Sequence, residues 1–286
     1  MTLQALFDSY CISRSIEPTT IVSYQAAINV FNRWLACHEF SGINVDDIDI
    51  DLLNQFLTEY GATVSKYTVN SKRRILIALL NFHLEPCRQV ITSKFVKRHK
   101  TSDTRRTSWM PEEVKRLFFF ASHLPGRLSN GTSRADYFRC LLLVAWETAA
   151  RRGDLTRITI EDIASGKPFL FVQKKTGTGV VYRLSASTVE SILSMPHSKD
   201  SRFAFPSWSG ETAWQLEAIT KTCRKIMVAA GLKSYDGCLK KLRRSAITRA
   251  EEIMPGTSYR FAGHTTPTTT IKSYLDPTRS NQARLE

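Results

Sequence analysis

The sequence predicts a mainly α-helical protein with one small antiparallel β-sheet: an all-helical N-terminal domain followed by an α+β domain. Apolar residues recur at spacings of three and four through most of the chain, which is typical of amphipathic helices. A basic segment without this periodicity interrupts the pattern near residue 100. Only one pair of β-prone runs follows, joined by a glycine-containing turn. We therefore expect a domain over residues 1–100, a linker to about residue 107, and a second domain over 108–286.

The first two helices of the N-terminal domain follow from apolar spacing and capping residues. After Pro18 one helix is predicted, with Thr19 or Thr20 as its N-cap and one apolar stripe made of Ile21, Tyr24, Ile28, Phe31 and Leu35. The aspartates that open "DIDIDLLNQFLTEYG" suit the N-terminal end of a second helix, and Gly61 is expected to end it. The same aspartates could suggest a metal-dependent nuclease, but their position before a helix favours capping.

Basic residues gather in two places of this domain. The segment "TVNSKRRILIALLNFHL" predicts a third helix that carries Lys72, Arg73 and Arg74 at its start, where cations oppose the helix dipole and are therefore expected to bind an outside partner. The following segment "SKFVKRHKTSDTRRTSW" predicts the linker. Such a charge run is either a solvated surface or a contact to DNA phosphates. The candidate residues for that contact are Lys97, Arg98, Lys100, Arg105 and Arg106.

The second domain begins with a helix at Pro111, whose following glutamates suit a helix N-terminus. The apolar segment "SRADYFRCLLLVAWETAA" predicts a buried helix, and "FLFVQKKTGTGVVYRLS" predicts a β-hairpin. Further helices are expected in "TVESILSM", "TAWQLEAITKTCRKIMVAAG" and "LKKLRRSAITRAEEIM". The last segment, "RFAGHTTPTTTIKSYLDP", has a threonine-rich run that we interpret as a tether.

Composition restricts the classes of function. The formal net charge is +14 and the 42% of hydrophobic residues suffices for real cores, so a folded protein with a polyanionic partner such as nucleic acid is expected, the alternative being a merely basic protein. The cysteines are scattered without zinc-type spacing, so we read them as reduced thiols of an intracellular protein. No apolar stretch is long enough to span a membrane.

Chemically distinctive residues then follow one another in a specific order. Arg151 stands in "ETAARRGDLTRI", Lys175 in the hairpin turn, Lys240 and Arg243 in "LKKLRRSAIT", and His264 ten residues before Tyr274. This order resembles the tyrosine recombinase (phage integrase) family, whose signature has an Arg in a T-G-L-R-x-x-E-L-like motif, a hairpin Lys, H-x-L-R, a G-H dipeptide and a tyrosine. Further positions agree with the family pattern: Thr148, Asp154, Leu155, Leu242, Ser245 and Thr248.

The resemblance implies a helical core-binding, SAM-like N-terminal domain and a catalytic domain in which a tyrosine attacks a DNA phosphodiester. Tyr274 would be the nucleophile that forms a 3′-phosphotyrosyl link. Arg151 and Arg243 would stabilise charge on the phosphate oxygens, and Lys175 would protonate the departing 5′-oxygen. His264 would donate to a phosphate oxygen. No metal ion, ATP or other cofactor is implied, since the phosphotyrosine stores the bond energy.

Several assignments differ from the family pattern or stay open. Lys240 stands where the family usually has histidine; it can donate to the phosphate but is a poor base for the tyrosine, so His264 or water is left to accept the proton. Ala149-Ala150 replaces Gly-Leu before Arg151, which reads as a mild change. Asp154 is interpreted as a cap or as an orienter of Arg151, and Lys174 is the alternative to Lys175.

Arg244 and Arg249 are interpreted as DNA-backbone or surface residues. The expected function is a site-specific recombinase or integrase acting as a homotetramer on double-stranded DNA, in the cytoplasm or nucleoid of a prokaryotic host or encoded by a mobile element. Accessory DNA-bending proteins are further candidate partners, and a membrane is not. The alternatives are relaxation of DNA in the manner of a type IB topoisomerase, or a catalytically degenerate protein that only binds DNA.

Overall fold

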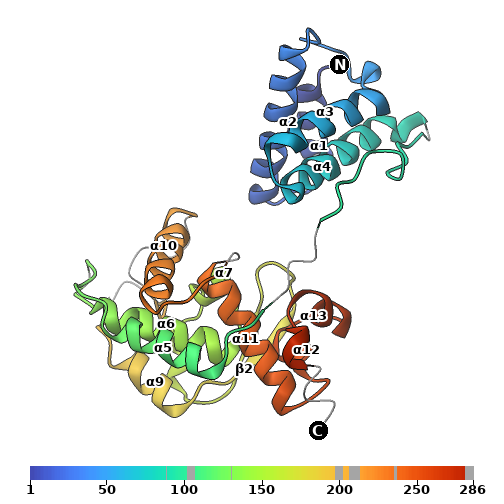
Figure 1. Ribbon diagram of the computed structural model, residues 1–286. Coiled ribbons are helices and arrows are strands. Elements are labelled where there is room, and N and C mark those ends of the chain that lie inside the picture. The colour runs from blue at the N-terminus through green and yellow to red at the C-terminus, as the bar shows by residue number, and fades with distance from the viewer. Residues whose placement is uncertain are drawn as a thin grey trace. The chain divides into compact units, whose positions relative to one another are not determined.

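The computed structural model describes residues 1–87, 89–101, 107–129, 131–196, 202–205, 213–234 and 237–280, and every structural statement below refers to them. The protein is mainly helical with one two-stranded antiparallel sheet, which confirms the predicted fold class. The chain forms two compact units, Met1–Asp103 and Thr104–Glu286 (Figure 1). Among the described residues, no helix combines the length and apolar character needed to cross a membrane.

Four helices build the N-terminal unit, and two 3₁₀ turns join or follow them. The helices are α1 (Leu3–Ser13), α2 (Pro18–Cys37), α3 (Ile50–Thr63) and α4 (Lys66–Leu84); the turns are Val45–Asp47 and Glu85–Cys87. α4 packs against the other three helices, as Figure 1 shows. The fully buried rings of Phe31 and Phe56 meet at 4.9 Å between centroids in its core.

The helix ends differ in detail from the prediction. α2 begins at Pro18 with Glu17 as its N-cap, because proline at the first helical position already has the required φ and lacks the N–H that a cap would satisfy. Gly61 does not end α3, which continues to Thr63. The ring of His99 occupies the space where a Cβ on Gly61 would lie, so this glycine permits a close approach. Asp49 caps α3, as the aspartate run predicted, by accepting from the Leu52 amide at 2.8 Å.

The position of the basic cluster on α4 is a correction. The helix begins at Lys66 after its N-cap Ser65, so Lys72, Arg73 and Arg74 lie in its second and third turns. The helix dipole acts mainly within the first and last turns. The prediction that these cations oppose the dipole is therefore wrong, and only their charge and exposure support a contact with DNA.

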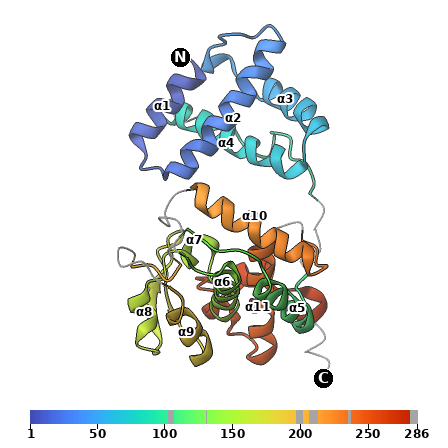
Figure 2. The same cartoon turned by 90° about the vertical axis from the view of Figure 1, so that its left-hand side faces the viewer.

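The C-terminal unit packs helices around α6, whose neighbours include α5, α9 and α11 (Figure 2). Its helices are α5 (Pro111–Ser122), α6 (Arg134–Thr148), α7 (Arg152–Leu155), α8 (Ile160–Ala164), α9 (Ala186–Leu193), α10 (Ala213–Ala229), α11 (Cys238–Ile253), α12 (Ser258–Phe261), α13 (Pro267–Ser273) and α14 (Pro277–Ser280). α6 is central because it is apolar on nearly every side, with eight of its residues buried.

The predicted β-hairpin is present. β1 (Phe169–Val172) pairs with β2 (Gly179–Tyr182) in antiparallel register, with Phe171 opposite Val180. Phe171, Val180 and Tyr182 are buried against the core, and intervening residues such as Val181 are exposed. This alternation is typical of a sheet with one solvated face. Residues 173–178 connect the two strands, and within this turn Gln173 is buried while Lys174 and Lys175 are exposed.

The threonine-rich run near the C-terminus is a short helix rather than a tether. Pro267 occupies the first turn of α13, where its fixed φ favours helix initiation. Tyr274 is the C-cap residue, with φ −131° and ψ −30°, and its amide donates to the Thr270 carbonyl. The tyrosine therefore stands at a defined helix end, half-buried, directly before the segment that leads into α14.

Candidate active site

Arg243 is the buried centre of the predicted site. α11 carries it into the core, where its side chain is only 3% exposed. Its Nη1 donates to the carbonyl of Ala149, and its Nη2 donates to the carbonyl of Ala262 at 2.9 Å. Burial lowers the pKa of Arg243, while the neighbouring Tyr274 works to raise it. A guanidinium stays protonated under such conditions, so a full positive charge is held here by fixed backbone dipoles.

Ala149 shows that the replacement of glycine in this motif is not mild. It is the C-cap of α6 and adopts the left-handed conformation, with φ +49° and ψ 27°. A residue with a Cβ pays roughly 1–2 kcal/mol for this region, which glycine does not. The conformation turns the Ala149 carbonyl toward Arg243, so the strained residue supplies one of the acceptors that hold the guanidinium.

His264 and Tyr274 complete a cluster around Arg243. The ring of His264 lies 4.7 Å from the ring of Tyr274, measured between centroids. The guanidinium carbon of Arg243 lies 5.1 Å from the centre of the tyrosine ring, and its Nη2 lies 3.2 Å from His264 Nε2. The structure thus brings together three of the predicted catalytic residues, contributed by α11, the loop before α13 and the end of α13.

His264 is neutral in this arrangement. Burial, followed by the charges of Arg243 and Arg151, lowers the pKa of His264 to about 4. Because an arginine can only donate, Nε2 acts as the acceptor of the Arg243 contact. The ring proton is therefore assigned to Nδ1, which lies 2.7 Å from the hydroxyl of Thr270 on α13. Protonation of Nε2 would place a third cation next to two arginines.

Arg151 is held by an amide, not by an acid. It is the half-buried N-cap residue of α7, and its Nη1 donates to Oε1 of Gln173 at the end of β1. The interpretation of Asp154 as its orienter is wrong. Asp154 Oδ1 accepts from the Lys174 amide at 3.0 Å and lies 3.8 Å from Arg157, so this buried carboxylate fastens α7 to the hairpin turn.

Both predicted catalytic lysines have exposed side chains, unlike the buried Arg243 and His264. Lys175 lies in the hairpin turn with an exposed side chain, and so does its alternative Lys174. Lys240 lies near the start of α11, exposed, one turn before Arg243. With Arg152 it lines a pocket of about 210 Å³ between α10 and α11. Lys240 and Arg243 thus lie three residues apart on one helix, as the sequence indicates. Their environments differ, because Arg243 is buried and Lys240 is exposed.

The predicted DNA-binding cations of the N-terminal unit differ in availability. Arg74, Lys97, Arg98 and Lys100 are exposed, and Lys72 is half-buried. Lys97 donates to the Thr58 hydroxyl at 3.0 Å. Arg73 is occupied within the protein, because its guanidinium donates to the carbonyls of Val96 and Ser93. Arg105 and Arg106 lie outside the described residues.

Arg244, which the sequence suggested as a DNA-backbone or surface residue, is buried. It is 7% exposed and donates to the Thr107 carbonyl at 3.4 Å, so it fastens the start of the C-terminal unit to α11. Arg249 is exposed, as expected of a surface residue, and lies 3.4 Å from Glu252.

The segment after Tyr274 docks on its own unit. The buried Asp276 accepts from the Ser108 amide at 2.5 Å and from the Thr278 hydroxyl at 2.6 Å. Burial acts to raise the pKa of Asp276, but these hydrogen bonds outweigh it and the pKa is lowered. Arg279 binds Glu252 on α11 through two nitrogens and also donates to the Trp109 carbonyl. The expected nucleophile is thereby held from both sides, by α13 before it and by Asp276 after it.

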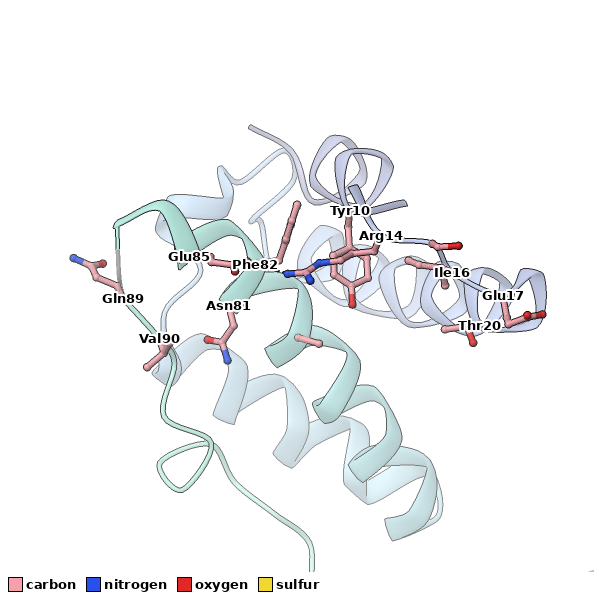
Figure 3. A pocket seen from close by; sticks show the side chains of 12 residues that line it. Tyr10, Arg14, Ile16, Glu17, Thr20, Asn81, Phe82, Glu85, Gln89 and Val90 are labelled. Atoms are coloured by element: carbon pink, nitrogen blue, oxygen red, sulfur yellow. Dashed lines mark hydrogen bonds and ion pairs between the residues drawn. The ribbon is translucent and has the colours of Figure 1, made fainter. Parts of the chain in front are cut away.

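A larger pocket, of about 720 Å³, lies in the N-terminal unit between the ends of α1 and α4 (Figure 3). Arg14 reaches across it toward the ring of Phe82 and pairs with Glu85 at 3.1 Å. Both charged groups are more than half exposed. The pocket contains none of the predicted catalytic residues, and a solvated ion pair gives it no reactive group.

Sequence reasoning missed Gln173, Thr270 and Asp276. These residues support the site from behind: Gln173 holds Arg151 and Thr270 holds His264. Asp276 anchors the segment next to Tyr274. A signal was present for Gln173, since a polar residue directly after an apolar β-run and next to the turn is a candidate for a buried amide. Nothing in the sequence alone marks Thr270 among the neighbouring threonines.

Comparisons with known proteins give one family match and a set of similar folds. Residues 3–89 match the family described as phage integrase, N-terminal SAM-like domain. No curated protein sequence is significantly similar to this chain.

Solved structures share the fold along the whole chain. A lambda integrase dimer bound to a COC′ core site is similar with a TM-score of 0.74 and 19% identity, over 98% of this chain and 97% of that one. The XerH site-specific recombinase bound to palindromic difH substrate, a post-cleavage complex, gives 0.73 and 18% over 99% and 84%. The Tn1549 transposon integrase in complex with circular intermediate DNA gives 0.70 and 14% over 100% and 99%. Residues 3–89 therefore match the N-terminal SAM-like domain of phage integrases, and the chain as a whole shares its fold with these integrase and recombinase structures.

Proposed function

We propose that the protein is a site-specific DNA recombinase that cleaves and rejoins DNA through a 3′-phosphotyrosyl intermediate, with Tyr274 as its nucleophile. The observation that carries this proposal is the convergence of Arg243, His264 and Tyr274 from separate elements. A cluster of a buried cation, a neutral histidine and a half-buried tyrosine has little value as core packing, because desolvating a guanidinium is costly. It suits the transfer of a phosphoryl group to a phenol oxygen.

The cleavage step uses the chain's own residues. The Tyr274 oxygen would form a bond to phosphorus while the bond to the 5′-oxygen breaks, and Lys175 would give that oxygen its proton. Arg243 and Arg151 would bind the non-bridging oxygens, where charge develops. A bound phosphodiester would also oppose the two arginine charges at His264 and raise its affinity for a proton, which makes His264 a better acceptor for the tyrosine proton than it is in the free protein.

The basic chain supplies the affinity for double-stranded DNA. The net charge of +14 and exposed cations such as Arg74, Arg98 and Lys100 support contact with phosphates. Structures of lambda integrase include a dimer on a core site and a tetramer bound to a Holliday junction. By analogy, we propose that this protein acts on two duplexes as a homotetramer. It would work inside the cell, where its DNA substrate is found, and accessory DNA-bending proteins are candidate partners.

The test uses duplexes selected from a random-sequence pool by binding to the protein. Selected sites are then nicked at successive positions, so that cleavage next to a nick releases a short fragment and traps the covalent product. Wild type should form a protein–DNA adduct that survives detergent, and Tyr274→Phe should form none while binding the same DNA. Tyr259→Phe, which removes the hydroxyl of another half-buried tyrosine of this unit, should behave like wild type.

Two results would contradict the proposal. An adduct formed by Tyr274→Phe would assign the nucleophile elsewhere, and the absence of any adduct with wild type would favour a protein that only binds DNA. Relaxation of a supercoiled plasmid that lacks a selected site would instead identify an activity like that of a type IB topoisomerase.

A further inference from the structure

Gln173 occupies a junction between the parts of the site. Its side chain is 1% exposed and lies at the end of β1, two residues before Lys175. Oε1 accepts from Arg151 Nη1 and from the Thr176 hydroxyl at 3.1 Å. Nε2 donates to the Ala262 carbonyl at 3.2 Å. The amide orientation follows from these partners, because a flipped amide would turn its NH₂ group toward two donors.

The Ala262 carbonyl is shared with the second arginine. Arg243 Nη2 donates to the same oxygen at 2.9 Å, so one backbone carbonyl connects Gln173 to Arg243. The two arginines repel each other, and the presence of Arg151 lowers the pKa of Arg243. A neutral amide can join them without neutralising either charge. A carboxylate at this position would pair with Arg151 and could not donate to the carbonyl.

Gly263 shows how closely the amide fits. Its φ is +63°, and a Cβ built there would collide with Nε2 of Gln173 and with Val180. The glycine before His264 is therefore required by contact with the hairpin as well as by its backbone conformation. As a consequence, the position of Gln173 is coupled to the loop that carries His264.

We infer that Gln173 is a positioning residue for the proposed cleavage reaction: it fixes the guanidinium of Arg151 relative to Arg243 through the shared Ala262 carbonyl, so that both reach one phosphate. The inference rests on the proposed function. Gln173 does not touch the DNA; it acts through Arg151.

The test measures the rate of adduct formation at saturating DNA, on the selected duplex described above. Gln173→Met keeps the length of the side chain but removes both ends of the bridge, and the rate should fall about 10²-fold, since a misplacement of about 1 Å has that effect. For Gln173→Glu the rate of adduct formation should fall at least as far, and this variant should also bind DNA more weakly. Val181→Thr, an exposed position on the same hairpin, should keep the wild-type rate.

A double-mutant cycle separates positioning from a merely structural role. In an Arg151→Ala background, Gln173→Met should slow the reaction by less than about threefold, because the group that it positions is already absent. Rates are compared at a temperature where circular dichroism shows every variant fully folded. A full and additive loss in that background would overturn the inference.

A second readout shows whether Gln173 acts through Arg151, which stabilises charge, or through Lys175, which donates a proton. When sulfur replaces the 5′-bridging oxygen, the leaving group no longer needs a proton, so loss of a proton donor is rescued while loss of charge stabilisation is not. Gln173→Met should stay slow on this substrate. Its rescue would mean that Gln173 serves the Lys175 turn, and a wild-type rate for Gln173→Met would overturn the inference while leaving the proposed function intact. Absence of an adduct with wild type would instead overturn the proposed function.

Discussion

The Arg243 cluster and the Lys175 turn are two parts of one proposed site, built in opposite ways. Arg243 is 3% exposed and fastened to two carbonyls, and His264 beside it is 6% exposed with both ring nitrogens in contact. Lys175 stands on a hairpin turn, exposed, and no hydrogen bond or ion pair of its side chain is found among the described residues.

The difference follows from the work proposed for each group. Stabilising charge on a phosphate requires dipoles and cations that are in place before the reaction and do not reorganise during it. Donating a proton requires a group that reaches the leaving oxygen at the right moment, and an exposed turn leaves that movement free. We therefore expect changes in the cluster to affect both activity and stability, and changes in the turn to affect activity alone.

The largest effect is expected for Arg243→Lys. Lysine keeps the charge but lacks the planar fork, so the contacts to Ala149 and Ala262 cannot both be made. The rate of adduct formation should fall about 10³-fold. The free energy of unfolding in urea should fall by about 2 kcal/mol, because the Ala149 carbonyl loses its arginine donor and the Ala262 carbonyl keeps only Gln173.

Arg249→Lys is the matched control on the exposed side of the same helix. It should change the unfolding free energy by less than about 0.5 kcal/mol and leave the rate near that of wild type. An Arg243→Lys protein as stable as wild type would contradict the role of the two carbonyls in the fold.

The next effect concerns the pH dependence of stability. His264 has a pKa of about 4 in the folded protein, against about 6.5 in the unfolded chain. Between these values the unfolded chain binds the proton and the folded protein does not, so stability is complete above about pH 6.5 and decreases as the pH falls toward 4. The free energy of unfolding, measured in urea, should decrease by as much as about 3 kcal/mol.

His264→Gln should flatten this part of the profile, because the amide does not titrate. His123→Gln, at an exposed position, should keep the wild-type profile. Equal pH dependence in wild type and His264→Gln would show that the histidine is not held in its neutral form.

A smaller loss, confined to activity, is expected for Lys175→Ala. The rate should fall about 10²-fold on an ordinary duplex and recover when sulfur replaces the 5′-bridging oxygen. The free energy of unfolding in urea should change by less than about 0.5 kcal/mol, because the side chain is exposed.

Lys174→Ala is the control from the same turn. It should keep most of the activity on both substrates. If Lys174→Ala shows the loss and the rescue instead, the neighbouring lysine is the proton donor, and if neither does, the turn has no part in the chemistry.

Much of the fold could be predicted because periodicity reports burial directly. The apolar run of α6 and the alternating hairpin residues lie where the pattern placed them. The predictions that were wrong concern residues whose type fits two different local structures. Gly61 has the residue type of a helix end, but it lies inside α3 and allows the ring of His99 to approach. The threonine-rich run has the composition of a tether, but Pro267 starts a helix there.

The sequence by itself determined the fold class, the family resemblance and the order of the candidate catalytic residues, since residue types and spacing are sufficient for these. Only the tertiary structure decided that Arg243, His264 and Tyr274 converge, that Gln173 rather than Asp154 holds Arg151, and that Arg244 is buried. The physical reason is that burial and hydrogen bonding join residues distant in the chain. A lysine or arginine has the same letter whether it is solvated or enclosed, and its environment determines what it can do.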